Sequence, residues 1–333
     1  MLQVIRPAIV LYLFAVFMTS LCTTYWQLML AQGVATGIGN GLLLFPSLSA
    51  PSQYFHKRRG AMLGLAITGS SVGAIVFPIL LGRLLNGGNG STEGGSGNGI
   101  GFGWTVRISA FVMAPVLAFS AVAIRARLPP RASRFLLPEA WRSPLFTLLV
   151  GTNFFLFATM LVPLFFIPTY AVVRSGTSEL LASYLVAVVN GASIPGRILP
   201  GVLSDRLGRL NMLLAAGAAT TIIVFCWPAV ETNAGIIVFA AFFGFCSGAI
   251  ISGGATALSL CPPTPQDIGT YTGMGMAVAA TGSLMGPPVV GALLKYDLSF
   301  RNVSYFCGAL GIVGTLLVLF AKMNTKAGLL GRV

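Results

Sequence analysis

The chain has 333 residues, of which 56% are hydrophobic and only 8% are charged, and its formal net charge is +13. A soluble domain has about 25% charged residues, so this composition excludes a soluble enzyme and indicates a protein whose main solvent is lipid. The positive charges lie between long apolar runs without the interleaved aromatic residues of a nucleic-acid surface, which excludes a nucleic-acid partner.

Charge-free intervals predict the membrane-spanning helices, because a helix needs about 20 apolar residues to cross a bilayer. Residues 7–55 contain neither a charge nor a histidine, which is long enough for two helices with a turn near residues 22–27. Eight further apolar runs bring the number of predicted spans to ten: 61–82, 108–124, 143–173, 180–203, 210–230, 232–258, 268–294 and 302–321.

The longest basic connection divides these spans into two groups. Residues 125–143 contain five arginines and several prolines and are predicted to be a cytosolic linker. The predicted organisation is an N-terminal bundle of four spans (1–124), this linker, a C-terminal bundle of six spans (144–321) and a cytosolic tail (322–333). The predicted fold class is therefore an all-α multi-pass membrane protein made of two bundles.

The distribution of Lys and Arg predicts the orientation. Fourteen of the twenty fall in one set of alternating connections, five fall in the other set, and one lies inside a span. The side that is richer in Lys and Arg is normally the cytosolic side, so both termini are predicted to be cytosolic.

An internal repeat supports a fold built from two related halves. Residues 68–85 ("TGSSVGAIVFPILLGRLL") and 281–296 ("TGSLMGPPVVGALLKY") share Thr-Gly-Ser-x-x-Gly, a proline and Gly-x-Leu-Leu. Secondary transporters are often built from such repeats, with the substrate site between them. The first half has two spans fewer than the second, which predicts either a ten-helix protein or a shortened form.

Two motifs resemble signatures of the major facilitator superfamily, a fold of two six-helix halves. "GVLSDRLGR" (201–209) resembles the cytosolic loop signature of that superfamily, and "YFHKRRGAMLGLAITG" (54–69) resembles a motif of its monocarboxylate-transporter family. The stretches "QGVATGIGNGLLLFPSLS" (32–49) and "GRILPGVLSDRLGR" (196–209) resemble fungal monocarboxylate permeases. The residues that carry the resemblance, and that we predict to form a cytosolic gate or topology motif, are Gly201, Asp205, Arg206, Gly208, Arg209, Tyr54, Phe55, Lys57, Arg58 and Arg59. Of these, Asp205, Arg206 and Arg209 are expected to form cytosolic ion pairs.

The resemblance covers the chain from the third helix of that family onward. It implies that the first two helices, with the acidic motif of the first, are absent from this sequence or are supplied by a partner. In proton-coupled relatives an aspartate lies one turn before the eighth-helix arginine, whereas this chain has Ser193 four residues before Arg197. Since all seven acids fall in loops or at span ends, the residues give no support to proton coupling.

Arg197 is the one charge inside a predicted span, roughly 12 Å from the cytosolic end at 1.5 Å per residue. One interpretation is a counter-charge for an anionic substrate, because a guanidinium suits a carboxylate. The other is an arginine that reaches the interface or pairs with helix-end carbonyls. Asn190 and Asn153 are predicted to line the same cavity, or else to hydrogen-bond between helices. Pro195 and Pro200, together with Gly191, Gly196 and Gly201, are expected to break the helix around Arg197.

The predicted function is a secondary transporter of small organic anions of the monocarboxylate type, working by alternating access. The alternative is a transport-inactive truncated paralogue, or a membrane sensor or scaffold. No metal site, cofactor or enzymatic activity is predicted. The predicted partners are a small organic anion and the lipid bilayer of the plasma or vacuolar membrane.

Overall fold

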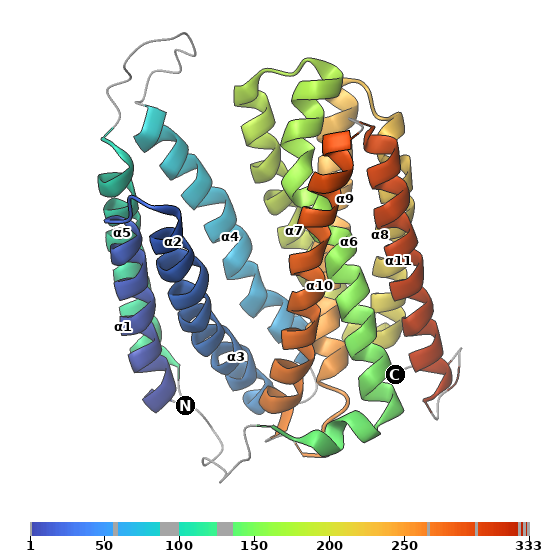
Figure 1. The fold of residues 1–333 in the computed structure, drawn as a ribbon. Helices are drawn as coiled ribbons and strands as arrows, with labels where there is room; N and C mark the ends of the chain where they lie inside the picture. The colour runs from blue at the N-terminus through green and yellow to red at the C-terminus, as the bar shows by residue number, and fades with distance from the viewer. Residues whose placement is uncertain are drawn as a thin grey trace. The chain divides into compact units, whose positions relative to one another are not determined.

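A computed structural model describes residues 2–55, 59–86, 100–124, 136–264, 267–296, 299–325, 328 and 331. Regular structure in these residues is entirely helical (Figure 1). The helices are α1 (Leu2–Thr19), α2 (Tyr25–Leu28), η1 (Met29–Ala35), α3 (Thr36–Tyr54), α4 (Arg59–Asn86), α5 (Phe102–Ala123), η2 (Pro138–Arg142), α6 (Pro144–Ser175), α7 (Glu179–Leu207), α8 (Arg209–Cys226), η3 (Trp227–Ala229), α9 (Asn233–Leu258), α10 (Ile268–Tyr296) and α11 (Phe300–Met323).

The ten predicted spans are confirmed as helices. Nine helices of the described part are long and apolar enough to cross a membrane, and α1 contributes a shorter apolar stretch, Val4–Thr19. The turn predicted near residues 22–27 lies at residues 20–24, between α1 and the continuous helix formed by α2, η1 and α3, so Tyr25 to Gln27 already belong to that helix. There, Gln27 accepts hydrogen bonds from the backbone N–H groups of Thr23 (3.0 Å) and Thr24 (3.3 Å), so its side chain closes the start of α2.

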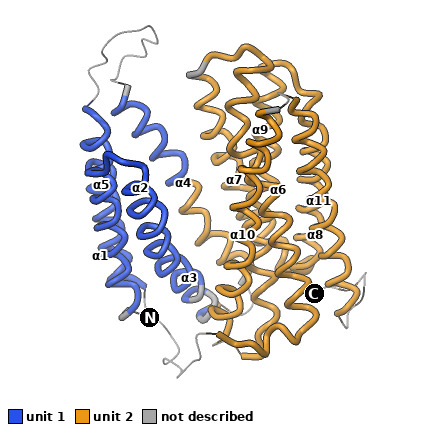
Figure 2. Tube along the Cα trace, in the orientation of Figure 1, with its two compact units in different colours: residues 1–54, 73–131 blue, residues 55–72, 132–333 orange. Residues whose placement is uncertain are grey.

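Packing divides the chain into two units (Figure 2). Unit 1 comprises Met1–Tyr54 and Gly73–Arg131, and unit 2 comprises Phe55–Val72 and Ala132–Val333. The boundary passes through α4, whose N-terminal part belongs to unit 2 and whose C-terminal part belongs to unit 1. The bundle boundaries predicted at residues 124, 143 and 321 stay a prediction.

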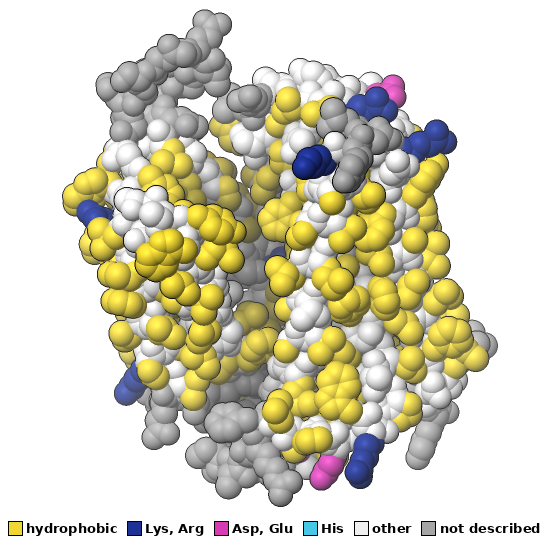
Figure 3. All heavy atoms as spheres, viewed as in Figure 1, with side chains coloured by type: hydrophobic (Ala, Val, Ile, Leu, Met, Phe, Trp, Pro, Cys, Tyr) yellow, Lys and Arg dark blue, Asp and Glu magenta, His cyan; other side chains and the backbone are white. Residues whose placement is uncertain are grey.

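Hydrophobic side chains cover most of the helix sides that face the viewer in Figure 3, and the visible Lys and Arg side chains lie mainly near helix ends. Exposed large apolar residues include Phe119 (73% exposed) in unit 1 and Leu284 (74% exposed) in unit 2. Such side chains would be costly in water but are favourable against acyl chains. The surface therefore matches the lipid environment that the composition predicts.

The core of unit 2 contains a buried aromatic cluster that joins four helices. Tyr170 of α6, Trp227 of η3 and Phe300 of α11 are each at most 2% exposed, and Phe239 of α9 stacks on Trp227 with ring centroids 5.9 Å apart. The Tyr170 hydroxyl donates to the carbonyls of Val230 (2.8 Å) and Trp227 (3.2 Å). The hydroxyl is thereby satisfied inside an apolar core, as a buried phenol requires.

The predicted break in α7 is wrong. The helix runs without interruption from Glu179 to Leu207, although it contains both Pro195 and Pro200. A proline removes one backbone hydrogen bond and strains one turn, and neighbouring helices in a membrane bundle can hold the helix together around it. One such neighbour is α9, which packs closely on α7.

Three glycines allow this close approach of α7 and α9. A Cβ atom added to Gly248 of α9 would lie 2.5 Å from the Ser193 carbonyl oxygen, and one added to Gly244 or Gly196 would overlap the facing backbone. Small residues of this kind let helix backbones touch in membranes, where van der Waals packing drives association.

Replacing Gly248 by Ala should therefore destabilise unit 2. We expect the free energy of unfolding to fall by about 1–3 kcal/mol, the usual cost of overpacking a rigid contact. The measurement is unfolding by SDS titration in mixed micelles. Gly273→Ala on α10 is the matched control, because its added Cβ would meet nothing within 4 Å. Equal stability of the two variants would contradict the close contact.

Candidate functional site

Arg197 lies in the interior of unit 2 and binds the N-terminal part of α4. Its side chain is only 5% exposed. Its Nη1 donates to the backbone carbonyl of Ile67 at 2.7 Å and to the hydroxyl of Ser70 at 2.5 Å. The guanidinium therefore joins α7 to α4 through two neutral oxygen acceptors.

The charge of Arg197 is only partly compensated. Among the described residues no carboxylate pairs with it, and its buried Nε has no hydrogen-bond partner. An arginine keeps its charge in proteins, so the site holds a cation with an unused donor. A buried cation without a counter-ion is costly, and an anion that reached it would relieve that cost.

Two serines next to this cation form a second link between the same helices. The hydroxyls of Ser71 on α4 and Ser193 on α7 lie 2.8 Å apart, and Ser193 donates to the carbonyl of Asn190 at 2.7 Å. Both serines are buried, at 0% and 3% exposure. The position where the family resemblance places an aspartate in proton-coupled relatives is thus filled by a neutral hydroxyl that is already paired.

Asp205, one of the predicted motif residues, caps the start of α4. Its Oδ1 accepts from the N–H of Gly60 at 3.0 Å and its Oδ2 accepts from the N–H of Ala61 at 3.1 Å. The first N–H groups of a helix have no partner within the helix, and the helix dipole favours a negative charge there. The sequence led us to expect ion pairs for Asp205, whereas these contacts are with backbone amides.

Glycines allow the two backbones to meet at this cap. A Cβ atom on Gly201 of α7 would lie 2.8 Å from the Gly60 carbonyl oxygen, and one on Gly60 would lie 2.6 Å from the Gly201 carbonyl oxygen. Gly208, between α7 and α8, has φ of 99°, which residues with a side chain rarely adopt. Both glycines of the "GVLSDRLGR" motif are thus explained by the structure: Gly201 allows α7 to approach α4, and Gly208 adopts the positive φ of the α7–α8 junction.

The structure describes fewer contacts for the other residues of the two motifs. Arg209 donates from Nη1 to the Ser259 hydroxyl at 3.4 Å. Arg206, Tyr54 and Phe55 are exposed. Arg59 begins α4, but its side chain lies outside what the structure describes, as do His56, Lys57 and Arg58.

The two asparagines make separate contacts. Asn190 lies two turns before Arg197 on α7 and donates to the Val186 carbonyl at 2.9 Å. Asn153 of α6 is fully buried and donates to the Leu149 carbonyl at 2.8 Å, and its amide oxygen, which has no partner, lies against Gly254 of α9. No hydrogen bond of the described residues joins Asn153 or Asn190 to Arg197. The cavity-lining role of both stays a prediction.

Sequence reasoning missed the α4 partners of Arg197 and Ser193. Ile67, Ser70 and Ser71 lie 130, 127 and 122 residues before the α7 residues that they contact. The sequence of this stretch indicated only the internal repeat and the family motif. The consecutive hydroxyls of Ser70 and Ser71 within an apolar span were the available signal, since buried hydroxyls need partners.

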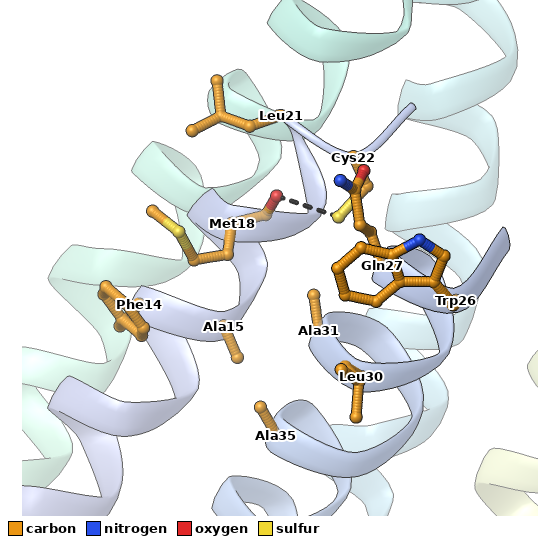
Figure 4. Close-up of a pocket in the computed structure, with 10 residues that line it drawn as sticks. All are labelled: Phe14, Ala15, Met18, Leu21, Cys22, Trp26, Gln27, Leu30, Ala31 and Ala35. Atoms are coloured by element: carbon orange, nitrogen blue, oxygen red, sulfur yellow. Dashed lines mark hydrogen bonds between the residues drawn. The ribbon is translucent and has the colours of Figure 1, made fainter. Parts of the chain in front are cut away.

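Unit 1 contains an open apolar pocket of about 400 Å³ (Figure 4). It lies between α1 and the α2–η1 segment, and residues of both line it, among them Phe14, Met18, Trp26 and Leu30. The Cys22 thiol at its rim donates to the Met18 carbonyl at 3.2 Å. None of its ten lining side chains carries a charge, so the pocket does not suit a carboxylate.

Comparison with known proteins identifies clear relatives. A family model described as "Major Facilitator Superfamily" matches residues 3–263 and 201–330. The aspyridones efflux protein apdF of Emericella nidulans is 43% identical over 326 residues, which cover 98% of this chain and 64% of that protein. The agnestins efflux protein AgnL12 of Paecilomyces divaricatus is 33% identical and is covered to 70%, with 95% of this chain aligned.

The fold also matches solved structures. A crystal structure of the E. coli fucose:proton symporter FucP aligns with a TM-score of 0.74 over 96% of this chain and 83% of that chain, at 15% sequence identity. This likeness concerns the fold alone. The chain spans about two thirds of the length of the two fungal proteins. These proteins are named for efflux and none is named as an enzyme, which agrees with the non-enzymatic prediction.

The Asp205 cap leads to a direct test. In Asp205→Ala the N–H groups of Gly60 and Ala61 lose their acceptor, and loss of a cap costs about 0.5–2 kcal/mol. We expect backbone hydrogen exchange in residues 59–64 to become faster, by about 2- to 30-fold. The measurement is hydrogen–deuterium exchange with mass spectrometry in micelles.

Arg206→Ala is the control for this test, because it changes the adjacent exposed side chain and leaves the carboxylate in place. Unchanged exchange of residues 59–64 in Asp205→Ala would show that the cap does not hold α4.

Proposed function

Because this chain belongs to the Major Facilitator Superfamily, we propose that it is a secondary transporter that carries small organic anions across a membrane by alternating access. The observation that carries the proposal is the buried Arg197, a cation held by two neutral acceptors with an unpartnered Nε. A carboxylate that docks there gains a charge-assisted hydrogen bond inside a medium of low dielectric constant, where such bonds are strong.

The substrate class extends the family assignment and rests on this arginine. The efflux names of apdF and AgnL12 support export as the direction of transport. They give no particular support to a monocarboxylate, so we propose organic anions in general, with monocarboxylates as the simplest members. The serine pair Ser71–Ser193 beside the arginine favours a carrier in which this position does not exchange a proton during the cycle.

The contacts between α4 and α7 supply a latch for the cycle. Asp205 holds the first turn of α4, and Arg197 holds its third turn through Ile67 and Ser70. Each contact is a hydrogen bond that can be exchanged for one to another polar partner. An anion that replaces Ile67 and Ser70 as the partner of Arg197 would loosen one of the two contacts, which links substrate binding to helix separation.

The distribution of charge supports a proposed orientation. The excess of Lys and Arg in alternate connections supports cytosolic termini, with the Asp205 latch on the cytosolic side. The plasma membrane or the vacuolar membrane is the proposed location. A transport-inactive membrane sensor or scaffold is the competing function, and it predicts no flux at all.

Transport can be tested with the purified chain in proteoliposomes. We expect counterflow of at least one radiolabelled anion among lactate, benzoate and succinate, or of aspyridones or agnestins. Arg197→Ala should lower the rate at least about tenfold, the equivalent of one lost charge-assisted contact of about 1.4 kcal/mol. Arg197→Lys should fall between, because an ammonium keeps the charge and loses the planar fork.

Arg301→Ala is the matched control, since this exposed arginine donates to the Tyr305 hydroxyl on the same helix at 2.9 Å and should leave the rate unchanged. Elution of each variant as a single species in size-exclusion chromatography establishes folding. Absence of counterflow for every compound with the folded chain would overturn transport and favour the sensor or scaffold.

A further inference from the structure

Unit 1 carries polar side chains on the exposed side of a membrane-spanning helix. Gln32 and Asn40 are exposed, and Thr36 lies half-buried between them. All three belong to the apolar span Tyr25–Leu48 formed by α2, η1 and α3. We call Gln32, Thr36 and Asn40 the amide column.

A π-helical segment aligns the amide column. Residues four apart in an α-helix are displaced by about 40° around the axis, because a turn has 3.6 residues. The wider turn of η1 (Met29–Ala35) reduces this displacement between Gln32 and Thr36. The Thr36 hydroxyl donates to the carbonyl of Ala31, five residues earlier, at 2.9 Å. Such π segments are found frequently at functional sites.

The opposite side of the helix is apolar. Val34, Ile38 and Leu42 are all exposed, at 51%, 53% and 41%. Each lies two residues after a member of the amide column, which places it about 200° away around the helix. The helix thus has one side suited to lipid and another that is not.

Open space lies beside the amide column. A Cβ atom added to Gly33, Gly37 or Gly41 would meet nothing within 4 Å. On the same helix, a Cβ atom on Gly39 would lie 3.0 Å from the Cβ of Tyr12, because that glycine packs against α1. The three open glycines therefore do not serve packing within unit 1, and they leave room next to the amides.

The two amides need partners that the described residues do not provide. Neither Gln32 nor Asn40 has a side-chain hydrogen bond to another described residue, while Thr36 is satisfied by Ala31. An amide that faces hydrocarbon without a hydrogen bond is strongly unfavourable. Its partners must be polar atoms outside this helix.

We propose that the amide column is a solute-binding face that takes uncharged oxygen-bearing groups, carbonyls and hydroxyls, of the transported molecule. This inference rests on the proposed transport function. An amide side chain offers both donors and an acceptor, so it pairs with either group. The span carries no charge from residue 7 to residue 55, so an ionised group finds no counter-charge on this helix. The column therefore selects the neutral, oxygenated part of a solute.

The test measures whether water reaches the column. In a chain whose five cysteines are replaced by serine, Asn40→Cys and Ile38→Cys are reconstituted separately in proteoliposomes. The probe is a methanethiosulfonate ethyltrimethylammonium reagent, which is water-soluble and does not enter lipid. We expect residue 40 to be labelled at least about tenfold faster than residue 38. Equal rates, or no labelling at residue 40, would show that the column faces lipid or another helix and would overturn the proposal.

The concentration for half-maximal uptake gives a second readout. For an anion that is transported, Asn40→Leu and Gln32→Leu should raise the concentration for half-maximal uptake about tenfold, whereas Val34→Ala should leave it unchanged. Unchanged values in both leucine variants would overturn the binding role. Uptake without labelling at residue 40 overturns the amide column alone, whereas labelling without uptake of any compound overturns the transport function on which the binding role rests.

Discussion

A guanidinium in a lipid-solvated helix bundle persists only where its N–H groups meet oxygen atoms. In this protein those atoms come from the neighbouring helix, because Arg197 of α7 reaches the Ile67 carbonyl and the Ser70 hydroxyl of α4. The carbonyl of Ile67 is within reach because the first half of α4 lies directly against α7. Position, charge and helix contact are therefore parts of one arrangement, and loss of the contact with α4 would leave a buried cation without compensation.

The close contact itself depends on residues without side chains. Gly60 and Gly64 of α4 meet Gly201 and the Arg197 backbone of α7, and Gly196, Gly244 and Gly248 do the same between α7 and α9. Helix α7 is thereby held on two sides by backbone-to-backbone packing. This explains why it stays helical through Pro195 and Pro200, and why the polar contacts of Asp205 and Ser193 reach their partners at hydrogen-bond distance.

The spans were predictable because hydrocarbon thickness fixes their length and charge marks their ends. The turn after α1 and the position of Arg197 inside a span were found in this way. The partners of Arg197 were not, because they lie 127 and 130 residues earlier and are a common serine and a backbone carbonyl. Asp205 was read as an ion-pairing residue, since a sequence shows charged partners and does not show which backbone N–H groups a fold brings near. The π-helical geometry of η1 could not be predicted, because the residues of this segment (MLAQGVA) are equally compatible with an α-helix.

The junction at Gly208 has a mechanical consequence. This single residue serves two helices, because its N–H donates to the Ser204 carbonyl at the end of α7 and its carbonyl accepts from Met212 in the first turn of α8. No linker longer than this one residue separates α7 from α8. A translation of α7 along its own axis must therefore move α8 as well. Rotation about the dihedral angles of one glycine is the remaining freedom. If α4 separates from α7, this junction therefore favours a rotation of α7 relative to α8 about Gly208 over a translation of α7 along its axis.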